Sequence, residues 1–118
     1  MKANELRIGN WVDFDKEEIA IDLEYFYWEI EGRGVLQHTK PIPLKEDWLL
    51  KFGFEDAHYG EYKKDRYTLD CEYTDKGIYY FIIDETCLEL DVKHVHQLQN
   101  LYHALTGEEL TIKQNDEK

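Results

Sequence analysis

The chain has 118 residues, of which 42% are hydrophobic and 14% aromatic, enough for one globular domain and too many for a disordered chain. It carries 14 basic and 26 acidic residues, a formal net charge of −12. The charge is spread evenly, because the parts before and after residue 60 each hold 7 basic and 13 acidic residues. Such a surface repels phosphates and anionic lipids, which argues against direct nucleic-acid or membrane binding and favours basic partners. The alternative explanation of the charge is solubility.

The first third of the chain predicts strands. Residues 6–14 form an expected strand with a bend at Gly9, followed by a charged turn at residues 15–17. In residues 19–30 apolar and polar residues alternate only to about Leu23, and then both parities become apolar or aromatic. We expect a long bent strand or two consecutive strands there. Turn glycines and a short strand that ends at two prolines complete an expected SH3-like barrel or half-barrel.

The middle of the chain predicts a short helix and then an antiparallel meander. Pro43, two acidic residues and Gly53 delimit the helix, and Trp48 lies on its apolar face, where we expect it in the core. From Tyr62 onward, three strands with turns near residues 74–77 and 84–86 are expected. If residues 73 and 78 pair across the first of these turns, Cys71 faces Tyr80 and lies too far from Cys87 for a disulfide.

The C-terminal helix is the best-defined element. An apolar stripe over residues 95–105 and Gly107 behind it predict its extent, and no charged residue occurs from His94 through Thr106. Interface cores are depleted in charge, so this uncharged face is either a partner-binding surface or a surface that packs under the N-terminal strands of the same chain. The polar residues of the face that would contact a partner are His96, Gln99, Asn100 and His103.

Enzymatic and metal-binding sites are not expected. His94, His96 and His103 lack the four-residue spacing with which helical histidines share a zinc ion. The chain contains no serine and no glycine-rich phosphate loop, and each cysteine lies in a strand pattern with no histidine nearby in the sequence. We therefore predict no catalytic residue, no metal ligand and no cofactor. Two cysteines and the lack of an N-terminal apolar segment favour a reducing cytoplasm.

Three segments carry a resemblance. "LRIGNWV" (6–12), "PIPLKEDWLLKFGF" (41–54) and "HVHQLQNLYHALTGEEL" (94–110) resemble the recurring blocks of a family of small uncharacterised proteins from gut bacteria, their phages and mobile elements. The resemblance implies a bacterial cytoplasm and an association with phages or mobile elements. It implies no catalytic residue.

Two classes of function follow. The first is a non-enzymatic accessory or protein-interaction module that uses the uncharged helix face. The second is an acidic mimic of nucleic acid that occupies a DNA-binding protein, because each of three i, i+2 pairs would place two carboxylates on one face of a strand. These pairs are Asp13/Asp15, Asp22/Glu24 and Glu29/Glu31. An enzyme is a third and less favoured class.

The predicted fold class is α+β. SH3-like N-terminal strands are followed by a short helix and by a three-stranded antiparallel meander that the C-terminal helix covers. Residues 1–112 form one expected domain with sub-regions of about 1–43 and 44–112, and residues 113–118 form a frayed tail.

Overall fold

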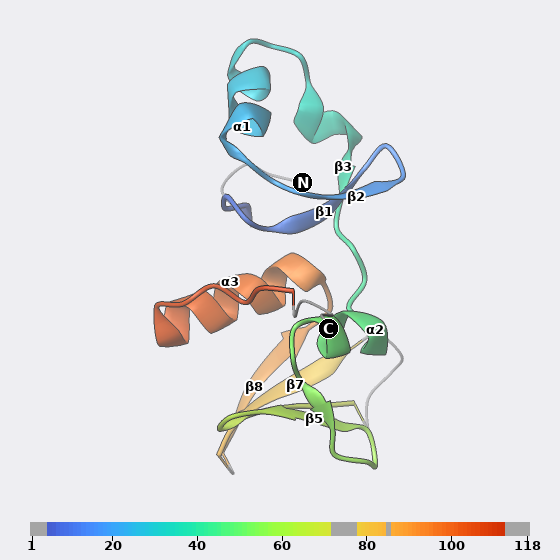
Figure 1. Cartoon of the computed structure of the whole chain (residues 1–118), viewed down its shortest axis with the longest axis vertical. Coiled ribbons are helices and arrows are strands. Elements are labelled where there is room, and N and C mark those ends of the chain that lie inside the picture. The colour runs from blue at the N-terminus through green and yellow to red at the C-terminus, as the bar shows by residue number, and fades with distance from the viewer. Residues whose placement is uncertain (1–4, 72–77, 85, 113–118) are drawn as a thin grey trace, which may run out of the picture. The chain divides into compact units, whose positions relative to one another are not determined.

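The computed structural model describes residues 5–71, 78–84 and 86–112 (Figure 1). It confirms an α+β protein with antiparallel sheets and a C-terminal helix. The described residues divide into two compact units, one formed by residues 5–42 with 94–109 and the other by residues 43–71, 78–84, 86–93 and 110–112. The predicted sub-regions also divide near residue 43, but the structure groups the C-terminal helix with the N-terminal elements, where residues 44–112 had been expected to stay together.

A three-stranded antiparallel sheet forms the base of the first unit. Its strands are β1 (Trp11–Phe14), β2 (Glu17–Ala20) and β3 (Thr39–Lys40), in the order β2-β1-β3. The expected bend is present as Gly9, whose φ of 98° suits a residue without a side chain, and the charged turn is confirmed between β1 and β2. The buried core of this unit comprises Leu6, Val12, Ile21, Tyr25 and Val35.

The strand expected to continue to residue 30 is wrong beyond Ala20. The chain instead forms helix α1 (Leu23–Ile30), and the Asp22 side chain caps it by accepting a hydrogen bond from the backbone N–H of Tyr25 at 3.0 Å. Tyr25 is buried, and its hydroxyl lies 2.6 Å from the Thr39 hydroxyl. The breakdown of alternation after Leu23 therefore marks the start of a helix and not a bent strand.

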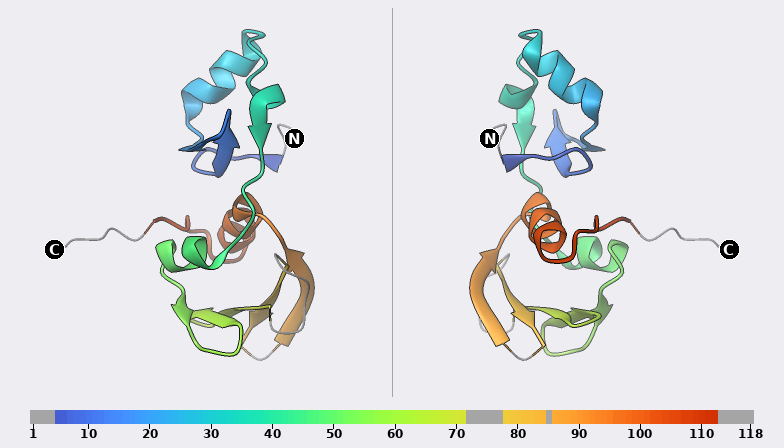
Figure 2. Two further views of the ribbon diagram at one scale, coloured as in Figure 1. Left: turned by 90° about the vertical axis from the view of Figure 1, so that its right-hand side faces the viewer. Right: turned by 90° about the vertical axis from the view of Figure 1, so that its left-hand side faces the viewer.

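A single 3₁₀ turn, η2 (Val35–His38), replaces most of the short strand expected before the prolines. Of the residues in that expected strand, Thr39–Lys40 pair with β1 and form β3. Gly34, with a φ of 69°, begins the turn, in agreement with the turn glycines expected there. Figure 2 shows α1 and η2 on the same side of the three-stranded sheet.

The second unit contains a short helix and a five-stranded antiparallel meander. Helix α2 (Glu46–Lys51) is confirmed, with Gly53 behind it at a φ of 92°. Trp48 is 3% exposed and so belongs to the core, as expected. The meander has two more strands than predicted, since it runs in chain order through β4 (Glu55–Asp56), β5 (Glu61–Lys64), β6 (Tyr67–Asp70), β7 (Tyr79–Ile83) and β8 (Thr86–Val92).

The predicted register of the meander is wrong by one residue. Asp70, not Cys71, lies opposite Tyr80. The expected turn near residues 74–77 lies outside the described residues. Both cysteines are free thiols, as predicted. Burial and the Asp70 carboxylate both raise the pKa of the Cys71 thiol, and this opposes formation of a nucleophilic thiolate there.

The C-terminal helix, α3 (Val95–Thr106), ends as predicted at Gly107 in the left-handed conformation, with a φ of 77°. Its apolar residues Val95, Leu98 and Tyr102 are buried. The backbone N–H of Val95 donates to the carbonyl of Ile42 at 2.9 Å, which ties the start of the helix to the first unit. Residues 109–112 form no strand, and residues 113–118, which were expected to form a frayed tail, lie outside the described residues.

Candidate functional site

The uncharged face of α3 meets the N-terminal segment of its own unit through Gln99. This side chain is 1% exposed. Its Oε1 accepts a hydrogen bond from the backbone N–H of Trp11 at 2.8 Å, and its Nε2 donates to the carbonyl of Gly9 at 2.9 Å. A primary amide supplies the acceptor and the donor together, which neither a carboxylate nor an ammonium group can do. The missing charge at this position therefore has a structural explanation.

Asn100 makes a second set of contacts with the same segment. Its Oδ1 accepts from Arg7 Nε at 2.7 Å and from Asn10 Nδ2 at 2.9 Å, and its Nδ2 donates to the Glu5 carbonyl at 3.0 Å. The Arg7 guanidinium also donates to the carbonyl of Gln99 at 3.1 Å and pairs with Glu109. Residues 5–11 are thus fastened to α3 by side-chain hydrogen bonds.

His96 lies at the N-terminal end of the same face and is 3% exposed. Burial lowers the pKa of its imidazole, the neighbouring His94 lowers it further, and Glu5 opposes the shift. Its Nδ1 has no hydrogen-bond partner within the described part of the chain, and its Nε2 lies 4.0 Å from Glu5 Oε1. His94 is the N-cap residue and lies just before the first helical residue. The rings of His94 and His96 stack with centroids 5.9 Å apart.

The structure places three of the four predicted partner-binding residues in contact with other residues of the first unit. Of the four, His96 and Gln99 are buried, Asn100 is half-buried and engaged by hydrogen bonds, and His103 is half-buried. Of the two alternatives that the uncharged face left open, the contacts of Gln99 and Asn100 match packing under the N-terminal strands.

A polar hollow of about 260 Å³ lies beside the turn between β1 and β2. The residues that line it are Asp13, Asp15, Lys16, Gln37, His38 and Lys40. One histidine and one carboxylate lie close together in this hollow. His38 Nδ1 is 3.3 Å from Asp15 Oδ1. Both side chains are more than half exposed, so water screens the interaction between them.

Helix α1 presents an apolar stripe to solvent. Leu23, Tyr27 and Ile30 are 71%, 53% and 85% exposed. They are spaced i, i+4 and i+7, so they lie within about 60° of one another around the helix. The opposite side of α1 faces the core through Tyr25, with Phe26 and Trp28 partly buried against it. We call Leu23, Tyr27 and Ile30 the α1 stripe.

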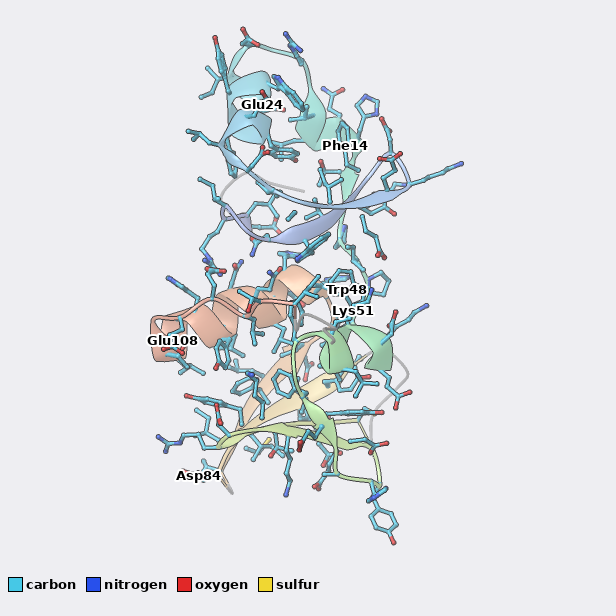
Figure 3. All side chains as sticks on the ribbon, viewed as in Figure 1. Phe14, Glu24, Trp48, Lys51, Asp84 and Glu108 are labelled. Atoms are coloured by element: carbon cyan, nitrogen blue, oxygen red, sulfur yellow. The ribbon has the colours of Figure 1, made fainter. Side chains whose placement is uncertain are left out.

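Carboxylates border the α1 stripe. Glu24 and Glu31 are both exposed and seven residues apart, which places them along the same flank, next to Tyr27 (Figure 3 labels Glu24). The strand geometry expected for the pairs Asp22/Glu24 and Glu29/Glu31 is wrong, because these residues cap, form or terminate a helix. The pair Asp13/Asp15 also lacks the expected strand geometry. Asp15 lies after the end of β1 and adopts a φ of 49°.

Comparison with known proteins adds no assignment: no protein-family model, curated protein or solved structure matches the chain. Among the described residues, no helix has the length and apolar character needed to cross a membrane. The sequence pattern predicts a strand for residues 23–30 and so does not reveal the α1 stripe. Its signals were an aspartate at the N-cap position and apolar residues at helical spacing.

Proposed function

We propose that this protein is a non-enzymatic protein-interaction module that docks a partner on the α1 stripe. One observation carries the proposal. Three large apolar side chains on one face of an eight-residue helix are exposed, while the other face of that helix supplies core residues. Scattered exposed apolar residues are ordinary, whereas an aligned group with a charged border is typical of an interaction site.

The cellular location and the association with phages or mobile elements are proposed from the sequence. The three blocks at residues 6–12, 41–54 and 94–110 support an accessory role in a bacterial cytoplasm, linked to phages or mobile elements. The SH3-like arrangement of the N-terminal strands also stays a prediction, since the three strands around β1 support only the coarser antiparallel sheet.

Quantitative co-purification with matched variants tests the docking surface. Three forms of the full-length chain are immobilised and exposed to a bacterial lysate. They are the wild type, the stripe variant L23Q/Y27Q/I30Q and the control variant L50Q/Y59Q/L105Q. The control alters three exposed apolar side chains elsewhere in the chain. We expect a bacterial protein that the wild type and the control retain equally and that the stripe variant loses. Equal retention by all three chains contradicts the proposal.

A further inference from the structure

The chain segment that contains the α1 stripe has only acidic charged residues as far as Gly32. Residues 17–32 contain six carboxylates and no lysine, arginine or histidine. The last turn of α1 carries no basic residue, although cations normally stabilise the carbonyl end of a helix. Glu31, directly after the helix, instead adds negative charge to that end. Arg33 is the first basic residue after the helix, and its Nε lies 3.3 Å from Glu31 Oε1. Both side chains are exposed.

The stripe and its acidic flank have a defined geometry. Measured around the helix from Leu23, Tyr27 lies at about 40°, and Glu31 and Glu24 lie at about 80° and 100°. An apolar row and a row of carboxylates therefore run side by side along α1, both open to solvent. A complementary surface has apolar residues at helical spacing with positive charges on one side of them.

The charge also decides between possible occupants. A second copy of this chain would bring another acidic flank against Glu24 and Glu31, and the net charge of −12 opposes that association. Anionic lipid is repelled for the same reason. Resting on the proposed docking function, we infer that the α1 stripe binds a basic amphipathic segment of a different protein, with lysine or arginine beside its apolar residues.

Three synthetic helical peptides test this partner class. They share one leucine stripe and differ only in the flanking residues, which are lysine, glutamine or glutamate. Binding to the full-length chain is measured by fluorescence anisotropy at 20 mM and 300 mM salt. We expect the lysine peptide to bind roughly tenfold tighter than the glutamine peptide at low salt, the glutamate peptide to bind weakest, and the advantage of lysine to shrink at high salt.

Two charge variants locate the effect. E24Q/E31Q removes the acidic flank, and E55Q/E108Q removes two exposed carboxylates elsewhere, so both change the net charge equally. The inference predicts that only E24Q/E31Q loses most of the preference for lysine. An equal loss in both variants overturns it, because the attraction then comes from the general charge. Dimerisation of the chain in sedimentation experiments, abolished by L23Q/Y27Q/I30Q, overturns it in favour of a second copy.

The same experiment separates this inference from the proposed function. If the lysine and glutamine peptides bind equally and L23Q/Y27Q/I30Q weakens both, the stripe is a docking site and the basic partner class is wrong. If no peptide binds, or if the stripe variant binds as well as the wild type, the docking surface itself is wrong. Circular dichroism of each variant verifies that α1 and the rest of the fold are retained.

Discussion

Helices α1 and α3 reverse the usual relation between the composition of a helix face and its location. The polar, uncharged face of α3 is fastened to the N-terminal segment, whereas the apolar face of α1 is exposed. The difference lies in what each face meets. Gln99 meets backbone groups that need an acceptor and a donor, while Leu23, Tyr27 and Ile30 lie on the side of α1 opposite the core residue Tyr25. A polar face is therefore not by itself evidence of a surface.

The largest expected effect is the loss of Gln99. Gln99→Ala removes two hydrogen bonds, from the Trp11 N–H and to the Gly9 carbonyl, and empties the space of a buried side chain, so we expect a loss of about 3 kcal/mol in the free energy of unfolding. Chemical denaturation measures it, with Gln37→Ala as the exposed control. A loss below about 0.5 kcal/mol would mean that the face of α3 does not pack as described.

The hydrogen bond between Arg7 and Asn100 provides a second test of the contact between residues 5–11 and α3. Arg7→Ala and Asn100→Ala should each cost about 1–2 kcal/mol, because each removes several hydrogen bonds between residues 5–11 and α3. A double-mutant cycle should give a coupling energy of about 1 kcal/mol. Additive losses would contradict a direct interaction between the two side chains.

The buried imidazole of His96 predicts a dependence of stability on pH. Because its pKa is lowered in the folded state, the unfolded chain binds the proton first, and stability is lost as pH falls through about 6.5 toward the lowered value. His96→Leu should flatten the curve of unfolding free energy between pH 7 and pH 5, whereas the exposed control His58→Asn should not. Parallel curves for wild type and His96→Leu would show that His96 is not held neutral.

The smallest change in the free energy of unfolding is expected for the α1 stripe. L23Q/Y27Q/I30Q should change the free energy of unfolding by less than about 1 kcal/mol, since these side chains are largely exposed. Tyr25→Ala, on the opposite side of α1, should cost about 3 kcal/mol or more. Thermal and chemical denaturation compare the two. A large loss in the stripe variant would indicate that the stripe is part of the core.

The helices with clear boundaries were predictable, and the contacts between distant segments were not. Gly53 and Gly107 mark the ends of α2 and α3, and the apolar spacing in front of each glycine matches a helix. Residues 23–30 are rich in tyrosine, phenylalanine and tryptophan, which favour strands, and the local cap from Asp22 outweighs that preference.

Register and pairing carry the remaining errors. A shift of one residue separates the expected partner of Tyr80 from the observed one, because the alternation of side chains along two strands does not by itself determine which residues lie opposite each other. Nothing local shows that Gln99 pairs with backbone groups 88 and 90 residues away in the chain. That pairing matches the alternative in which the uncharged face packs under the N-terminal strands, and it appears only in three dimensions.

The central claim is that the partner docks on α1 and not on the uncharged face of α3. Site-specific photo-crosslinking tests it most directly, with a benzophenone side chain in place of Tyr27 on α1 or of His103 on α3, in the full-length protein inside bacterial cells. We predict one discrete cross-linked partner from position 27, lost when Leu23 and Ile30 are changed to glutamine, and none from position 103. A partner captured from position 103 and not from position 27 would contradict the account.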